Sequence, residues 1–129
     1  MSPISIPLQS AGGGPLAIAG TFASFAVFLS ITAHIAARNV LGDVPVRNAF
    51  LVGPVPAAIS ILIATFAEND PVLFGGLFVA LALDGVAIAY VYGESRKLSA
   101  YITLIHFVVS VILGTILFGI WALATSAPG

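Results

Sequence analysis

Four long apolar runs constrain this chain more than any other feature of its sequence. Asp84 is the one charged side chain inside the runs, which cover residues 16–37, 48–67, 71–93 and 98–124. A hydrocarbon core about 30 Å thick needs about 20 apolar residues per helix, so each run is long enough to cross a bilayer. A soluble helix bundle would need a charged face on every helix, and none of the four runs has one.

The runs therefore predict an all-α membrane protein whose fold is a four-transmembrane-helix bundle. All 129 residues belong to a single membrane domain, because little chain is left for anything else. The charged residues between the runs set the expected helix limits, which are residues 16–38, 46–67, 71–93 and 98–124.

Composition excludes several classes of function. Only 7% of the residues are charged and 60% are hydrophobic, whereas a soluble domain has about 25% charged residues. Four Lys and Arg residues and a net charge of -1 are too little for a nucleic-acid groove. No cysteine is present, so thiolate chemistry is excluded. Nucleophile elbows, paired-histidine zinc helices and phosphate-binding glycine loops are missing as well, which makes catalysis the least favoured class and predicts no cofactor.

The basic residues predict the topology. Arg38 and Arg47 flank the first loop, Arg96 and Lys97 lie in the third loop, and the second loop carries acidic side chains instead. By the positive-inside rule the two basic loops lie on the cytoplasmic side of the cell membrane, with the N- and C-termini outside. The four basic side chains are expected to contact lipid at the interface.

The second run contains an unusual Gly53-Pro54-Val55-Pro56 segment. Two prolines remove two backbone donors, so the helix is expected to be kinked or broken at Gly53, Pro54 and Pro56. A helix starting at Pro54 would be only about 21 Å long, so residues 46–52 must complete the span. Either a simple kink widens the inner end, or a discontinuous helix directs backbone dipoles at an ion or a headgroup.

The outer turn between the second and third runs reads Glu68-Asn69-Asp70-Pro71. Asp70 is expected to cap the third helix, and Pro71 suits its first position, where a missing N–H has no cost. The second and third helices should therefore be adjacent and antiparallel.

Small residues recur at spacings of three and four along every run. Such stripes let helix backbones approach closely, and holding helices together is their commonest role. The stripes comprise Ala19, Ala23, Ala26, Ser30, Ala33 and Ala37; Gly53, Ala57, Ser60 and Ala64; Gly76, Ala80, Asp84 and Ala87; and Thr103, His106, Ser110 and Gly114. Asp84 and His106 lie within these stripes, so both are expected to face protein and not lipid.

Asp84, His106 and His34 form the candidate proton or ion pathway. Counted from the basic side at 1.5 Å per residue, His34 is about 6 Å deep, His106 about 12 Å and Asp84 about 14 Å. Intramembrane ionisable groups often mark such pathways, and this one would open toward the cytoplasm. The alternative is a buried Asp84–His106 pair that only fixes helix register. A two-histidine, one-carboxylate metal site lacks any local spacing to support it, so no metal is predicted.

In style the whole chain resembles small four-span membrane proteins of haloarchaea, which include families without an assigned function. The most distinctive segments are Gly42-Asp43-Val44-Pro45-Val46-Arg47 and Val52-Gly53-Pro54-Val55-Pro56. The resemblance implies no activity and no site residues.

Two functions remain open at this stage. The first is association of transmembrane helices, either as a homo-oligomer or as an accessory subunit of a membrane complex, which the stripes and short loops favour. The alternative is a proton- or ion-coupled channel or transporter that uses Asp84 and His106. The bilayer is the expected partner in both, and nucleic acid in neither.

Overall fold

The computed structural model describes residues 14–126, and this part of the chain contains helices and no strand. The helices are α2 (Gly14–Leu41), α3 (Val46–Val52), α4 (Pro54–Phe66), α5 (Asp70–Tyr92) and α6 (Arg96–Ser126). With α3 and α4 taken together as Val46–Phe66, four helices are long and apolar enough to cross a membrane. The predicted all-α membrane fold with four spans is confirmed, as is the kink in the second span.

Two glycines and one asparagine set the helix limits. Gly42 (φ 85°) and Gly93 (φ 65°) follow the ends of α2 and α5 in the left-handed conformation, which glycine adopts at low cost. Asn69 caps α5, because its Oδ1 accepts a hydrogen bond from the Val72 N–H at 3.0 Å. The prediction that Asp70 is the cap is wrong. Asn69 has the extended backbone that a capping residue needs, and Asp70 already lies in the first turn.

The kink between α3 and α4 has both a chemical and a steric cause. Pro54 and Pro56 have no N–H to continue the helical ladder, although Gly53 itself keeps helical angles (φ -54°, ψ -40°). A Cβ at Gly53 would lie 2.7 Å from the Ser30 Cα of α2, so only glycine permits this crossing. The Ser30 hydroxyl is satisfied within its own helix by the Ala26 carbonyl at 2.7 Å.

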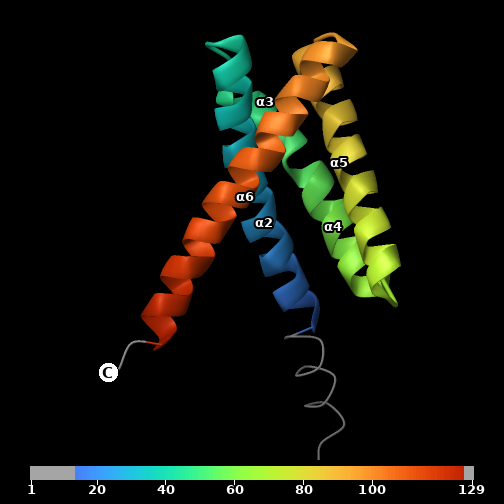
Figure 1. Cartoon of the computed structure of the whole chain (residues 1–129), viewed down its shortest axis with the longest axis vertical. Coiled ribbons are helices and arrows are strands. Elements are labelled where there is room, and N and C mark those ends of the chain that lie inside the picture. The colour runs from blue at the N-terminus through green and yellow to red at the C-terminus, as the bar shows by residue number, and fades with distance from the viewer. Residues whose placement is uncertain (1–13, 127–129) are drawn as a thin grey trace, which may run out of the picture.

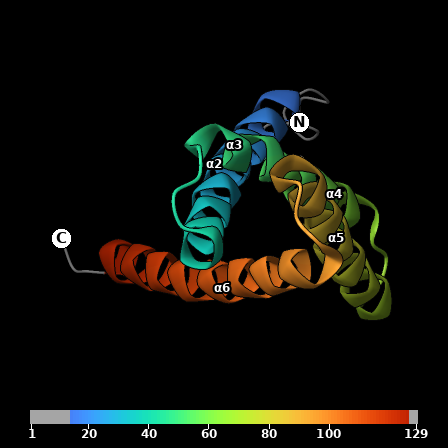
Figure 2. The ribbon, with the colours of Figure 1, turned by 90° about the horizontal axis from the view of Figure 1, so that it is seen from above.

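The two ends of the molecule differ in how its helices are arranged. Figure 1 shows α6 crossing α2 part-way along both helices. The half above this crossing ends in the two basic loops and is here called the basic end; there α3 packs against both α2 and α5. At the opposite end, here called the terminal end, α2, the α4–α5 pair and α6 stand as three separate legs. Figure 2 shows α6 crossing beside α2 and then extending beyond the other helices. Helix α6 packs against α2 and α5 but not against α4. The described helices therefore do not form a bundle that is packed on all sides, because α4 and α6 do not contact each other.

Most of the buried apolar core lies in the basic half. It consists of small or branched side chains from α2, α3, α5 and α6, all at most 1% exposed: Ala33, Ala36, Ala37, Ala49, Val52, Ile88 and Ile102. Four of these residues are alanines, which allow close backbone approach. A smaller cluster of Ala26, Leu29 and Ala57 joins α2 to α4.

Candidate functional site

Asp84 of α5 and His106 of α6 meet in the interior of the protein. Asp84 Oδ2 lies 2.5 Å from His106 Nδ1, and the two residues are only 2% and 3% exposed. Each side chain lies in the small-residue stripe of its helix, on the face that packs against the neighbouring helices. The expectation that both face protein is therefore met.

Helix α2 completes a polar network around this pair. His106 Nε2 lies 3.0 Å from the Leu29 carbonyl oxygen and 2.9 Å from Thr32 Oγ1. The Thr32 hydroxyl donates to the Leu29 carbonyl at 3.1 Å and accepts from the Ser110 hydroxyl at 2.9 Å. Asp84, His106 and Thr32 therefore tie together α5, α6 and α2 across the bundle.

The network assigns the protons on His106. A carbonyl oxygen only accepts, so Nε2, which faces the Leu29 carbonyl, must carry a proton. One further proton must then lie between Nδ1 and Asp84 Oδ2, because two bare lone pairs would repel each other at this distance. It rests on either atom, as imidazolium with carboxylate or as neutral imidazole with carboxylic acid. In both forms the pair carries no net charge.

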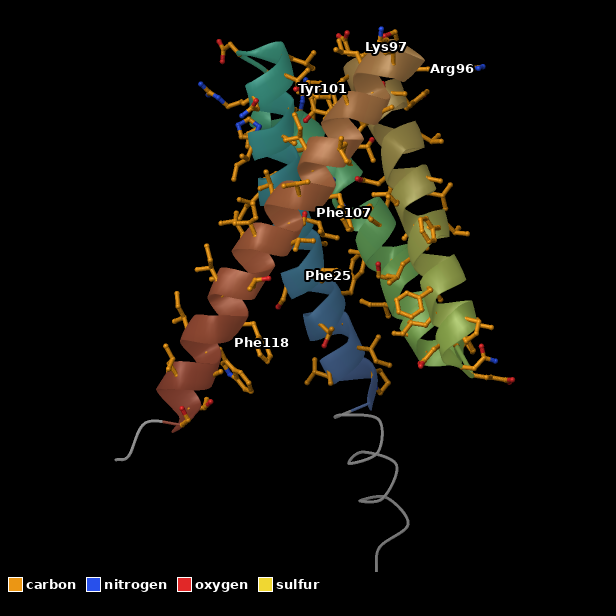
Figure 3. All side chains as sticks on the ribbon, in the orientation of Figure 1. Phe25, Arg96, Lys97, Tyr101, Phe107 and Phe118 are labelled. Carbon is orange, nitrogen blue, oxygen red and sulfur yellow. The ribbon has the colours of Figure 1, made fainter. Side chains whose placement is uncertain are left out.

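The second oxygen of Asp84 is left without a partner. Asp84 Oδ1 is buried and accepts no hydrogen bond from any described residue. Asp84 and His106 line a cavity of about 160 Å³, together with the hydroxyl-bearing Ser60 and Ser110. The remaining walls are apolar and include Phe25 and Phe107, which both lie in the central part of Figure 3. Asp84 Oδ1 is thus a buried acceptor that no described residue satisfies, on a side chain that lines the cavity.

His34 does not join the pair. Its Nδ1 is buried without a hydrogen-bond partner, and within residues 14–126 His34 forms no hydrogen bond with Asp84 or His106. The structure thus brings together two of the three candidate pathway residues. In the described range no three metal-binding side chains gather in one place.

The candidate helix-break residues lie beside the network. Gly53 packs against Ser30 of α2, two residues before Thr32, and Pro56 is buried in the wall of the cavity. The kink therefore places α4 along the cavity. The backbone keeps helical hydrogen bonds on either side of the two prolines, from the Gly53 N–H to the Ala49 carbonyl and from the Ala57 N–H to the Gly53 carbonyl, which favours a kink over an unwound ion-binding segment.

The four basic side chains are all exposed and all lie at the basic end. Figure 3 shows Arg96 and Lys97 pointing away from the helices at that end. Among described residues, the His106–Asp84 contact is the sole pair of opposite charge type within 4.0 Å, so these four cations have no carboxylate partner there. They are free to contact lipid phosphate.

Sequence reasoning did not find Thr32 or the Leu29 carbonyl. Thr32 lies beside the α2 stripe and not in it, and a backbone acceptor has no sequence signature. A threonine at the depth of Asp84 and His106 is the one signal that was available, since a buried hydroxyl requires a partner.

Comparison with known proteins places the chain in a family. Residues 12–128 match the model of a family of unknown function, DUF7473. The chain belongs to this family. No curated protein and no solved structure matches it.

Proposed function

We propose that the protein acts through association of its transmembrane helices, forming a homo-oligomer in the cell membrane. The observation that supports this best is that the small-residue stripe of α2 continues beyond its contacts within the chain. Ala33 and Ala37 are 1% and 0% exposed, whereas Ala19 and Ala23 of the same stripe are exposed. Small stripes are stabilising where a second backbone packs on them, so the open part lacks its partner.

The surroundings of this open stripe support the same proposal. Ala17, Gly20, Thr21, Ser24, Phe25 and Phe28 line a hollow of about 660 Å³ along α2. Gly20 has nothing within 4 Å of the position of a Cβ, and the hydroxyl residues Thr21 and Ser24 are exposed. Hydroxyls and a bare glycine are typical of helix–helix contacts in membranes and unusual on a surface that faces only lipid.

The proposed orientation follows from charge. All four Lys and Arg residues lie at the basic end, so the termini and the open half would lie outside the cytoplasm. The proposal includes an archaeal cell membrane, because the chain resembles in style small four-span proteins of haloarchaea. A larger membrane complex with this chain as accessory subunit is the other form that association would take.

Crosslinking tests the proposal directly, because the chain has no cysteine of its own. Thr21→Cys should form disulfide dimers in native membranes, and Tyr90→Cys, at a position that is 88% exposed on α5, should form far fewer. In mild detergent, Ala23→Leu should reduce the oligomer. Ala82→Leu, the same change at an exposed α5 position, should leave it intact.

Two results would count against association. One is a monodisperse monomer in mild detergent with no co-purifying protein. The other is equal crosslinking of Thr21→Cys and Tyr90→Cys, which would mean that the hollow along α2 has no preferred partner. Capture of a different protein at Thr21→Cys would favour the accessory-subunit form instead.

A further inference from the structure

We infer that the cavity beside Asp84 holds water and lets the proton shared by Asp84 and His106 exchange with the terminal side of the membrane, and not with the basic side. This inference does not depend on the proposed association. It rests on the unpartnered Asp84 Oδ1, on the hydroxyls that share its cavity and on where the apolar core lies.

The basic side of the network is closed by apolar side chains. One helical turn from Asp84, His106 and Thr32 in that direction lie Ile88, Ile102 and Ala36 respectively, which are each 0% exposed and belong to one core cluster. Three helices therefore place a buried apolar residue at the same level. The pathway expected from the sequence ran in this direction, toward His34 and the basic loops.

Two buried hydroxyl side chains on the basic side, Thr103 and Ser99, do not bridge this barrier. Thr103 donates its hydroxyl to the Ser99 carbonyl at 2.7 Å, and Ser99 donates to the Glu94 carbonyl at 3.5 Å. Both hydroxyls are thus used within the chain segment that begins α6. A proton relay needs donors and acceptors that connect between groups, and these two connect only to their own backbone.

The terminal side of the network is open by contrast. The cavity residues on every helix are displaced from the pair toward the terminal end: Phe25 on α2, Ser60 on α4, Leu77 and Ala80 on α5, and Ser110 on α6. Leu77 is 47% exposed, so the cavity reaches the surface of the protein.

Water fits this cavity better than an acyl chain. A volume of about 160 Å³ has room for roughly five waters at about 30 Å³ each. A bound water needs two to four polar partners, and the side chains of Asp84, Ser60 and Ser110, which line the cavity, carry the polar groups to supply them. An acyl chain would leave the buried carboxyl oxygen unpaired, which is costly. Since the Asp84–His106 pair carries no net charge, a neutral donor suits the oxygen and no metal cation is required.

Among the residues that the structure describes, two titratable groups line this cavity. Asp84 comes from α5 and His106 from α6, while the lining residues from α2 and α4 include none that titrates. Protonation changes in the cavity therefore belong to this pair. Under this inference, water that fills the cavity is the exchange partner of the shared proton, and the helices need not separate.

Single cysteines provide the test, because the natural chain is free of cysteine. Ser60→Cys on α4 and Ala80→Cys on α5 report on the cavity from two helices. Leu62→Cys and Val79→Cys are matched controls on the same helices at exposed positions, 54% and 53%. A membrane-impermeant cationic methanethiosulfonate reacts with the thiolate, which forms in water and not in lipid. Glu68→Cys and Lys97→Cys identify the terminal and basic sides of oriented vesicles.

The two cavity cysteines should react about tenfold or more faster than their controls, and only when the reagent is on the side that labels Glu68→Cys. Ala36→Cys in the apolar core should remain unreactive from either side. Rates for Ser60→Cys and Ala80→Cys equal to those of Leu62→Cys and Val79→Cys would show a cavity filled with lipid and overturn the inference. Reaction from the Lys97→Cys side would overturn its direction.

The proton itself is followed by nuclear magnetic resonance on protein with ¹⁵N-labelled histidine. The chain has two histidines, so in His34→Gln the ring signals of His106 are the only histidine signals that remain. The proton between His106 and Asp84 should exchange with water, and the cross-peak should disappear in Asp84→Leu. A persistent proton without exchange to water would contradict the inference even if the cysteines were labelled.

Discussion

The basic half and the terminal half of this protein use the same sequence pattern with opposite results. On α2, alanines and serine at spacings of three and four run through both halves. In the basic half Ala33 and Ala37 are buried, because α3 brings a second backbone against them. In the terminal half Ala19 and Ala23 are exposed. A small-residue stripe allows close packing, but it is the facing element that decides whether packing occurs.

The polar network lies at the border between these halves. Toward the basic end it meets buried Ile88 and Ile102, and toward the terminal end it meets the cavity. The comparison of the two halves therefore bears on the site as well as on the fold.

Breaking the Asp84–His106 pair should have the largest effect. His106→Leu leaves Asp84 buried without a partner, which is expected to cost about 3–5 kcal/mol in the free energy of unfolding. Phe107→Leu, next to it at a position that is 51% exposed, should cost far less. Equilibrium unfolding in mixed detergent micelles measures both. Adding Asp84→Leu to His106→Leu should recover part of the loss, and an additive double mutant would mean that the two residues do not act as a pair.

The next largest effect is expected from the same substitution at two positions along α6, which should change the free energy of unfolding by different amounts in the two halves. Ile102→Ala removes a fully buried side chain from the core and should lower the free energy of unfolding by about 2–5 kcal/mol. Ile116→Ala changes a residue that is 50% exposed on the free part of α6, and should change that free energy by less than about 0.5 kcal/mol. Equal losses at the two positions in the monomer would contradict the open terminal half.

Two Gly→Ala changes should shift the free energy of unfolding in opposite directions. At Gly53 a Cβ would lie 2.7 Å from the Ser30 Cα, and backbone atoms cannot move aside as a side chain tip can, so the change should cost about 1–3 kcal/mol. At Gly75 nothing lies within 4 Å, so alanine should stabilise α5 by up to about 1 kcal/mol through its higher helix propensity. Thermal unfolding of both variants checks the signs. Two stabilising changes would refute the close crossing.

The smallest difference is expected from a pair of Thr→Val changes on α2. Thr32→Val removes a hydroxyl that accepts from Ser110 and contacts His106, which should cost about 0.6 kcal/mol, the average for side-chain hydrogen bonds between membrane helices. Thr21→Val removes an exposed hydroxyl and should have no effect on unfolding of the monomer. A larger cost for Thr21→Val in the membrane than in the monomer would instead indicate a partner at that surface.

Much of the fold could be predicted from the sequence because its causes are local. Run length and charge placement gave the four spans to within three residues at each end, since hydrophobic thickness sets helix length. The proline pair and Gly53 predicted the kink. The left-handed glycines at Gly42 and Gly93 fit the expected turns. Asn69 was missed as a cap because Asp70, one residue later, has the same chemistry.

The site was only partly predictable. The depths of Asp84 and His106 below the basic side differ by about 2 Å, and His34 lies about 6–8 Å nearer to that side. The pairing of Asp84 with His106 could therefore be expected, and the separation of His34 is consistent with these depths. Thr32 was missed because depth alone does not give the rotation of α2. The open terminal half could not be predicted at all, because the stripe of α2 repeats through both halves and sequence does not tell which part finds a neighbour.

The separation of the halves itself is tested most directly by distances between spin labels on the natural cysteine-free background. One pair, Asn39→Cys with Lys97→Cys, joins α2 to α6 at the basic end. The other, Ala17→Cys with Ala122→Cys, joins the same two helices at the terminal end. In nanodiscs that hold one copy, double electron–electron resonance should give a narrow distribution for the basic pair and a broad one for the terminal pair. Two equally narrow distributions would show a bundle packed along its whole length and contradict this account.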